Sequence, residues 1–243
     1  MEKSREKLAL ALDNVSSREE IEKLIKITSQ WVGVYKIGLE QFTRFGPPIL
    51  ELVRKQERKI FLDLKFHDIP NTVSKAVSSA CELGVHYMTI HTQGGVAMMQ
   101  AAAEAASKAK SEICTKIIGV TLLTSINAHA LAEELAIQMD STTYVQHLAT
   151  LAIISKLNGI VCSAADLPGV KEILPEHFEV ITPGIRPSGS DIGDQARIAT
   201  PKEAIQNGAT LLVVGRPITG AKEPGEAAEI ILREISDTRQ QNV

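Results

Sequence analysis

A short segment of this chain places charged side chains at the end of an apolar run. Residues 61–72, Phe-Leu-Asp-Leu-Lys-Phe-His-Asp-Ile-Pro-Asn-Thr, carry Asp63 and Lys65 among apolar neighbours, with Asp68 just beyond. If the run is a β-strand, side chains two residues apart share a face, so Asp63 and Lys65 point the same way. Burying charge is costly, and an ammonium beside carboxylates stays protonated. The spacing therefore predicts a lysine that can donate a proton in a reaction.

A second lysine is expected to join this group. Lys36 closes an earlier apolar run, and with Asp63, Lys65 and Asp68 it gives two cations and two anions whose charges cancel. One interpretation is a buried ion network with a structural role. Such networks break even at best against apolar packing, so stability is a poor reason to keep four charges together. The pattern favours a catalytic site.

A third feature indicates phosphate binding. Residues 211–218, Leu-Leu-Val-Val-Gly-Arg-Pro-Ile, predict a strand, a glycine turn at Gly215 and a helix start with proline in its first turn. Backbone N–H groups at a helix start attract anions, and the planar guanidinium of Arg216 fits phosphate oxygens. The alternative is an ordinary turn with a solvated arginine. A Gly/Pro/Ser-rich stretch at 183–197 carries Arg186 and Gln195, and long stretches of this kind are more often functional lids than defects.

Apolar runs of strand length recur along the chain and alternate with helical patterns. The eight runs are Leu8 to Leu12, Gly33 to Ile37, Ile60 to Leu64, His86 to Ile90, Lys116 to Val120, Gly159 to Cys162, Phe178 to Thr182 and Thr210 to Val214. Helices are predicted at Ser17 to Gln30, Thr72 to Leu83, Ala97 to Ala109, Thr142 to Ser155 and Glu223 to Ile235. This alternation predicts an α/β fold, a (β/α)8 TIM barrel forming a single domain over residues 1–243, although an open doubly wound sheet alternates in the same way.

In such a barrel the active site forms at the carboxyl ends of the strands. Polar residues gather at these ends: Asp13, Lys36, Asp63, Lys65, His91, Thr124, Ser125, Arg186, Gly215 and Arg216. Solvation alone does not explain this convergence. Barrel enzymes commonly bind phosphate near strands seven and eight, so the expected position of Arg216 after the eighth run favours the phosphate site.

The composition is that of an ordinary globular enzyme. Of 243 residues 44% are hydrophobic and 23% charged, and the formal net charge of −3 argues against a general attraction to nucleic acid or anionic membranes. Cys81, Cys114 and Cys162 lack the spacing of a zinc site or a disulfide framework. No signal-peptide pattern or apolar run of membrane-spanning length occurs, so we expect a cytoplasmic protein.

Taken together, the motifs resemble those of the orotidine 5'-phosphate decarboxylase family. The resemblance rests on residues 61–72, Leu12-Asp13, Lys36-Ile37-Gly38, Leu123-Thr124-Ser125, residues 182–186 and residues 214–217, and so covers nearly the whole chain. It implies a homodimeric barrel that converts orotidine 5'-phosphate to uridine 5'-phosphate and carbon dioxide in pyrimidine biosynthesis. It also implies that no metal ion or organic cofactor takes part.

The resemblance further implies a role for each matching residue. Lys65 would deliver a proton to C6 of the pyrimidine, Asp63 would sit beside the departing carboxylate, and Lys36 would hold Asp63 and the ribose hydroxyls. Asp68 would orient the lysines of the neighbouring subunit. The implied nucleotide contacts are Asp13 and Thr72 to the ribose, Thr124 and Ser125 to the pyrimidine, and Arg186, Gln195, Gly215 and Arg216 to the phosphate. Taken alone, Asp13 or Asn14 could instead cap a helix, and Ser125 could cap one that starts near Asn127.

Two other functions fit parts of the pattern. Magnesium-dependent sugar-phosphate lyases of the same superfamily, such as ketogulonate-phosphate decarboxylases and hexulose-phosphate synthases, share Asp-x-Lys-x-x-Asp. They place a metal-binding glutamate where Lys36 stands, and an ammonium there would repel Mg²⁺. A barrel that senses a nucleotide or sugar phosphate without turning it over would use the phosphate loop. A pure binder gains nothing from placing Asp63 beside a substrate carboxylate, so the sequence favours the decarboxylase.

Overall fold

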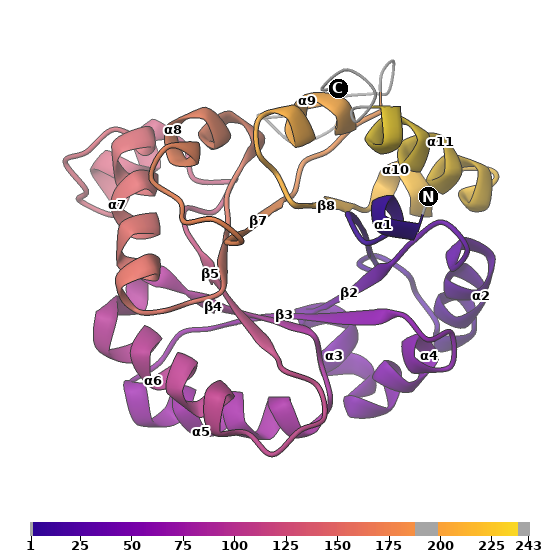
Figure 1. The fold of residues 1–243 in the computed structure, drawn as a ribbon, viewed down its shortest axis with the longest axis horizontal. Coiled ribbons are helices and arrows are strands. Elements are labelled where there is room, and N and C mark those ends of the chain that lie inside the picture. Colours follow the sequence, from indigo (N-terminus) through magenta and orange to yellow (C-terminus); the bar gives the residue numbers. More distant parts are fainter. Residues whose placement is uncertain (1, 188–198, 238–243) are drawn as a thin grey trace.

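The computed structural model describes residues 2–187 and 199–237, and within these residues eight parallel strands form a closed barrel (Figure 1). The strands pair in chain order, and the eighth closes on the first. Their bounds are β1 Leu8–Ala11, β2 Val34–Gly38, β3 Lys59–Phe66, β4 Tyr87–His91, β5 Lys116–Val120, β6 Gly159–Val161, β7 Glu179–Thr182 and β8 Leu211–Val214. The predicted (β/α)8 barrel is therefore confirmed, and closure rules out the open doubly wound sheet.

Each strand presents alternate side chains to two hydrophobic clusters. On β1, Ala9 and Ala11 belong to the smaller cluster, whereas Leu8 and Leu10 pack into the larger one. Side chains from every strand of the barrel enter or pack against the smaller cluster, which therefore fills the inside of the barrel. The larger cluster lies between the strands and the surrounding helices.

The inward-facing positions change from apolar to polar toward the carboxyl ends of three neighbouring strands. Val34, Phe61 and Tyr87 belong to the inner cluster. Two residues further along β2, β3 and β4 come Lys36, Asp63 and Thr89. All three are buried, so the fold itself carries polar groups into the upper part of the barrel.

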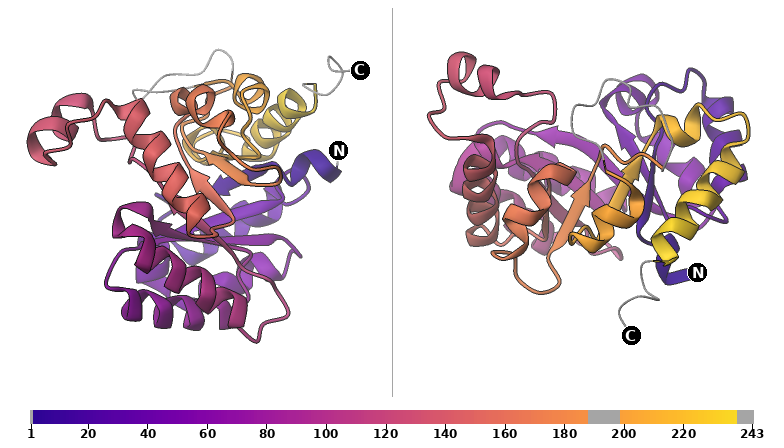
Figure 2. Two further views of the ribbon diagram at one scale, coloured as in Figure 1. Left: turned by 60° about the vertical axis from the view of Figure 1, so that its left-hand side comes forward. Right: turned by 90° about the horizontal axis from the view of Figure 1, so that it is seen from above.

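Helices surround the barrel on its outside (Figures 1 and 2). The longer ones are α2 Arg18–Thr28, α5 Pro70–Glu82, α6 Gly95–Lys108, α7 Ser141–Ile154 and α11 Pro224–Asp237, and they confirm the predicted helices. Short ones are α1 Glu2–Arg5, α3 Leu39–Phe45, α4 Leu50–Arg54, α8 Leu167–Lys171, α9 Pro201–Gln206 and α10 Arg216–Thr219. Four helical turns, η1 Pro47–Ile49, η2 Thr92–Gly94, η3 Ala130–Glu134 and η4 Ala164–Asp166, complete the order. The short elements span too few turns to give a periodic pattern.

Two helix starts decide between the alternatives for Asp13 and Ser125. Ser17 begins α2 with a capping box, in which its side chain accepts from the backbone of Glu20, so Asp13 does not cap this helix. At the turn η3, the side chain of Asn127 accepts a hydrogen bond of 2.9 Å from the N–H of Ala130. The capping role considered for Ser125 is thus taken by Asn127.

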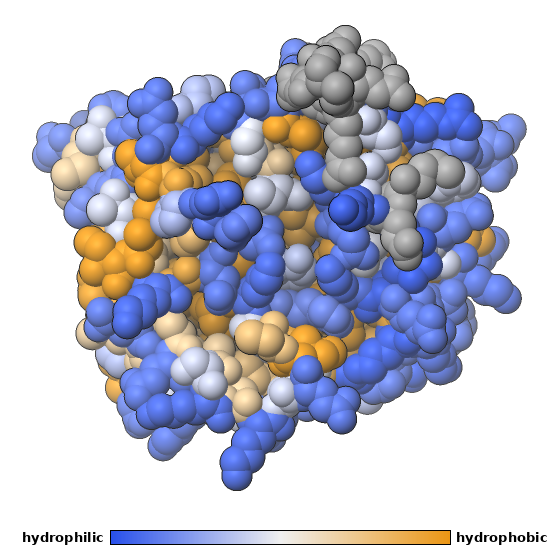
Figure 3. All heavy atoms as spheres, viewed as in Figure 1, coloured by the Kyte–Doolittle hydropathy of each residue, from blue (hydrophilic) through white to orange (hydrophobic). Residues whose placement is uncertain are grey.

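The connection from β5 to α7 stands away from the barrel (Figure 2). It contains the π-helical turn η3 and carries exposed apolar side chains at Leu135 and Met139. Elsewhere on the face drawn in Figure 3 hydrophilic side chains predominate, with smaller apolar areas between them. No helix among the described residues has both the length and the apolar character needed to cross a membrane.

Candidate active site

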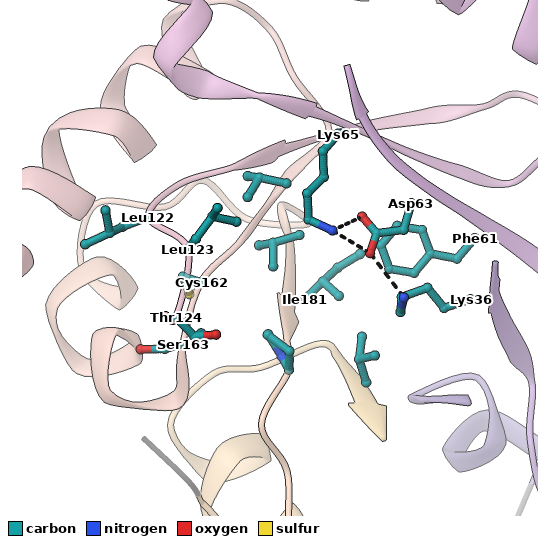
Figure 4. Close-up of a pocket in the computed structure, with 14 residues that line it drawn as sticks. Lys36, Phe61, Asp63, Lys65, Leu122, Leu123, Thr124, Cys162, Ser163 and Ile181 are labelled. Carbon is teal, nitrogen blue, oxygen red and sulfur yellow. Dashed lines mark hydrogen bonds and ion pairs between the residues drawn. The ribbon is translucent and has the colours of Figure 1, made fainter. Parts of the chain in front are cut away.

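Four charged side chains meet inside the mouth of the barrel. The Nζ atom of Lys65 donates hydrogen bonds of 2.9 Å to both carboxylate oxygens of Asp63. Lys36 Nζ lies 3.3 Å from Asp63 Oδ2 and donates a 2.7 Å hydrogen bond to Asp13 Oδ2. The charges alternate in the order Asp13, Lys36, Asp63 and Lys65, and Figure 4 shows the last three side chains converging.

The parallel pairing of β1 with β2 brings Asp13 and Lys36 together. Lys36 pairs with Ala11 in the β1–β2 ladder, so Asp13 follows only two residues after this pair. Gly38 leaves room for the carboxylate, since a Cβ atom there would lie 2.6 Å from Asp13 Oδ1 and 3.2 Å from Lys36 Nζ. A side chain at Gly38 would therefore push the Asp13 carboxylate out of its present position.

The end of β3 is irregular where it carries Asp63 and Lys65. Leu62 pairs with Met88 and Phe66 pairs with Ile90, so three residues of β3 lie opposite the single residue Thr89 of β4. Lys65 takes a φ of 49°, in the left-handed region that non-glycine residues rarely occupy. The prediction that Asp63 and Lys65 share a face assumed a regular strand. The two side chains do meet, but a bulge rather than simple alternation brings them together.

Burial and neighbouring charges shift the pKa values of Asp63 and Lys36 in opposite directions. Burial alone would raise the pKa of Asp63, but Lys36 and Lys65, with hydrogen bonds from Lys65 and Thr89, hold this pKa below its usual value. Burial alone would lower the pKa of Lys36, yet the carboxylates of Asp63 and Asp13 raise it above its usual value. Both groups are therefore charged at neutral pH.

Asp68 does not join this network within one chain. Its side chain is exposed and accepts a 2.6 Å hydrogen bond from the N–H of Ile69, and no described residue forms an ion pair with it. The second carboxylate of the network is Asp13, for which the sequence had implied only a ribose contact. Within one protomer Asp68 lies apart from Lys36, Asp63 and Lys65, and its expected role in the site of the neighbouring subunit stays a prediction.

An apolar pocket opens beside the two lysines. Its wall includes Leu122, Leu123 and Ile181, with Thr124 and Ser163 as the hydroxyl groups at its edge (Figure 4). Ser163 lies two residues after the end of β6, and its hydroxyl donates a 2.6 Å hydrogen bond to the buried Asp166. A flat, partly polar ring would fit such a pocket, with its polar edge toward the hydroxyl groups.

A second hollow adjoins the first and is basic. The two share Lys36, Pro183 and Val213, and the second is also lined by Asp13, Asn14, Gly184, Arg186, Gly215 and Arg216. Two guanidinium groups and one ammonium favour an anionic group there. The site thus has an apolar part and an anion-binding part on either side of Lys36.

The remaining predicted residues lie outside both hollows or outside the described part of the chain. Ser125 and Thr72 are exposed and line neither hollow. Gln195 falls at 188–198 and lies outside the described residues. The sequence interpretation missed Thr89 and Ser163. Ser163 could have been found from the sequence, because it directly follows the sixth predicted run, Gly159 to Cys162. That run was the one predicted strand for which no polar residue was proposed at the carboxyl end.

Across the described ranges, no group of three or more His, Cys, Asp or Glu side chains is arranged to hold a metal ion. The rings of His67 and His91 lie 5.4 Å apart between centroids, tilted by 39° to each other. In the described network, two lysines and two carboxylates pair with one another, and Arg186 and Arg216 line the adjoining hollow.

A parallel barrel with a charged site at its mouth and an adjoining anion-binding hollow defines an enzyme class that acts on small phosphorylated molecules. Over residues 6–231 the chain matches the model of the orotidine 5'-phosphate decarboxylase / HUMPS family. The chain belongs to this family.

Relatives and solved structures are similar over nearly the whole length. A protein from Moorella thermoacetica named orotidine 5'-phosphate decarboxylase is 42% identical over 235 residues, covering 96% of this chain and 93% of that protein. One of the same name from Dichelobacter nodosus is 48% identical over 197 residues, covering 81% and 85%. The crystal structure of orotidine 5'-phosphate decarboxylase from Lactobacillus acidophilus superposes with a TM-score of 0.82 at 33% identity, covering 94% of this chain and 98% of that one.

Proposed function

We propose that this chain decarboxylates orotidine 5'-phosphate to uridine 5'-phosphate in pyrimidine biosynthesis. The observation that carries the proposal is the ammonium of Lys65, held 2.9 Å from both oxygens of Asp63 at the edge of an apolar pocket. Membership in the family and the printed names of the relatives support the same reaction.

The reaction leaves charge on carbon that the substrate cannot spread. When the bond between C6 and the carboxylate breaks, its electron pair stays on C6 and carbon dioxide departs. That pair lies in the plane of the ring, where no conjugated group can accept it, so an external positive charge must stabilise it. The Lys65 ammonium supplies this charge and then gives its proton to C6, leaving a neutral amine that solvent reprotonates.

The network keeps this ammonium in place before the substrate arrives. Preorganised donors in a site sheltered from water are worth about 3 to 4 kcal/mol each in other enzymes. Asp63 fixes Lys65, and Lys36 neutralises the far side of Asp63. In this proposal the carboxylate of Asp63 also lies beside the substrate carboxylate and repels it. This repulsion is relieved when the substrate carboxylate departs as carbon dioxide.

The other parts of the nucleotide follow from the two hollows. In this proposal the pyrimidine occupies the apolar pocket with its polar edge toward Thr124, and the ribose hydroxyls lie against Asp13 and Lys36. A contact from Ser125 to the pyrimidine remains part of the proposal, although Ser125 is exposed and lines neither hollow. In this proposal the phosphate binds Arg216 at Gly215, with Arg186 in the same hollow. Gln195, which lies outside the described residues, is proposed as a further phosphate ligand. Binding energy from the phosphate, far from C6, can be used to exclude water and orient the ring.

We also propose that the enzyme is a homodimer with shared active sites, in which Asp68 and Thr72 reach the partner's pocket. Both are exposed and lie close in sequence to the exposed apolar side chain of Ile69, and Leu123, after β5, is a further exposed apolar side chain. Burying such apolar side chains in an interface would stabilise a dimer. Residues 1–243 form a single domain in this proposal, which includes a cytoplasmic location and no metal ion, organic cofactor or nucleic-acid partner.

The test is a turnover assay with the purified protein, following the loss of orotidine 5'-phosphate absorbance with a chelator present throughout. We expect turnover at full rate after exhaustive chelation, because the Lys36 ammonium occupies the place where a metal would bind. Activity that vanishes and returns only with Mg²⁺ would assign the chain to the sugar-phosphate lyases. Tight binding of the nucleotide without loss of absorbance would make it a sensor.

A further inference from the structure

Thr89 joins the two chain segments that carry the catalytic groups. It lies on β4 opposite the bulge of β3, and no part of its side chain is exposed. Its Oγ1 atom is 2.8 Å from Asp63 Oδ1 and 2.9 Å from the backbone nitrogen of Lys65. One hydroxyl thus contacts both members of the pair proposed to act on the substrate.

The direction of both hydrogen bonds is fixed by chemistry. The backbone nitrogen of Lys65 can only donate, so the hydroxyl of Thr89 must accept there. A hydroxyl has a single proton, and that proton remains available for the ionised carboxylate of Asp63, which can only accept. The hydrogen bond from Thr89 is also one of the contacts that lower the pKa of Asp63.

The hydroxyl replaces a contact that the sheet cannot supply. Along β3 the backbone N–H groups alternate between β2 and β4, and the N–H of Lys59 donates to Gly33 on the β2 side. Regular alternation would turn the N–H of Lys65 toward β2 as well, but in the bulge, where three residues of β3 lie opposite one of β4, it faces Thr89 of β4. A buried N–H group without a partner is rare in folded proteins. Thr89 satisfies this N–H while Lys65 holds its left-handed φ of 49°.

We propose that Thr89 is a positioning residue for the decarboxylation, setting both the carboxylate of Asp63 and the backbone from which the Lys65 ammonium extends. This role rests on the proposed function. Thr89 does not touch the pocket itself, so it acts only through the other two residues. Its loss should therefore slow the chemical step while leaving nucleotide affinity nearly unchanged.

Three variants separate the hydroxyl from the shape of the side chain. Thr89→Val keeps the branched shape and removes the oxygen, Thr89→Ala removes both, and Thr89→Ser keeps the oxygen and loses the methyl group. We expect kcat to fall roughly 10- to 100-fold in the valine and alanine variants, with KM changed by less than about 3-fold. The serine variant should stay within about 5-fold of the wild type because its hydroxyl can make both hydrogen bonds.

Thr115→Val is the matched control. Thr115 is equally buried in the loop before β5, where its hydroxyl donates a 2.8 Å hydrogen bond to the carbonyl of Val85 and touches neither hollow of the site. This variant loses a buried hydroxyl and should keep the wild-type kcat. Equal losses of kcat in Thr115→Val and Thr89→Val would mean a general loss of stability and would overturn the proposal.

Crystal structures of the Thr89 variants give a readout that does not depend on turnover. The proposal expects Lys65 Nζ to move away from Asp63, or Lys65 to leave the left-handed region, in Thr89→Val or Thr89→Ala but not in Thr89→Ser. An unchanged pair in the variants without the hydroxyl would refute the role of Thr89. If the wild-type protein does not decarboxylate the nucleotide, the proposed function is refuted. The role of Thr89 in that reaction is then refuted as well.

Discussion

Lys36 donates its shorter contact to Asp13 and not to Asp63: its Nζ atom lies 2.7 Å from Asp13 Oδ2 but 3.3 Å from Asp63 Oδ2. Asp13 therefore makes the closer contact with Lys36, whereas Asp63 contacts both lysines and lies closer to Lys65, at 2.9 Å. The reacting pair can change charge during proton transfer while Lys36 and Asp13 stay fixed. We therefore assign a positioning role to the pair of Lys36 and Asp13, and the proton transfer to the pair of Lys65 and Asp63.

Replacing Lys65 with alanine should abolish turnover with little loss of nucleotide affinity. The ammonium stabilises the carbanion and supplies the proton, and both contributions exist mainly in the transition state. We expect kcat to fall by at least about 1,000-fold, with the dissociation constant of the product nucleotide within about 10-fold of the wild type. Single-turnover kinetics and calorimetric titration measure the two quantities. A variant with near-normal kcat would remove Lys65 from the role of proton donor.

Replacing Arg216 with alanine should weaken catalysis through the phosphate. A hydrogen bond to a charged group contributes about 1.5 to 3 kcal/mol, so kcat/KM for the whole nucleotide should fall roughly 10- to 150-fold. The substrate analogue without its phosphate should be unaffected by the change. Arg233→Ala is the control, since Arg233 is an exposed residue of α11 that pairs with Glu229. An equal loss for both substrates would show that Arg216 does not bind the phosphate.

Protonation of Asp63 should destabilise the fold at low pH. Although burial raises the pKa of this carboxyl, the nearby lysines hold it below its ordinary value of 3.8. A carboxyl with a lowered folded-state pKa stabilises the protein above the unfolded-state value, and this stabilisation is lost as the pH falls through the folded-state pKa. Urea denaturation of the wild type should therefore show a free energy of unfolding that declines as the pH falls below 3.8.

Asp63→Asn should lack this part of the pH dependence because an amide does not ionise. The difference in free energy of unfolding between the variant and the wild type should narrow toward low pH. Glu176→Gln, at a carboxylate that is 88% exposed, should parallel the wild type throughout. A constant difference between Asp63→Asn and the wild type over the acidic range would show that Asp63 is not held ionised by its neighbours.

The strands could be predicted from the sequence, whereas the details of the site could not. A strand buried on both faces must be apolar along its length, so runs such as Leu8–Ala11 and Leu211–Val214 are visible without any structure. The end of β3 departs from this regularity. In its bulge the N–H of Lys65 donates to the hydroxyl of Thr89, which lies 24 residues further along the chain, and local patterns contain no information on that contact.

The pairing of Asp13 with Lys36 was also beyond the sequence. Both residues were expected at the barrel mouth, but which carboxylate each lysine contacts depends on side-chain conformations and on the space left by Gly38. The motif around residue 65 placed Asp68 near the lysines because they are close in sequence. In the fold, the chain turns outward at Ile69 to begin α5, so Asp68 faces solvent in the single chain.

The exposed position of Asp68 leads to a test of the shared site. If Asp68 completes the partner's site while Lys36 serves its own, Lys36→Ala and Asp68→Ala homodimers should both be nearly inactive. A dimer with one chain of each kind has one site that lacks both residues and one site in which every residue is wild type, so up to about half of the wild-type activity per dimer should return. The two variants are refolded together with different affinity tags, and heterodimers are isolated with both tags before assay. The control is a heterodimer of Thr115→Val and Lys36→Ala chains, refolded and isolated in the same way, which should show that refolding itself preserves activity. Purified heterodimers that stay inactive while this control regains activity would place Asp68 in the site of its own chain, and an Asp68→Ala homodimer with normal activity would place it outside the reaction.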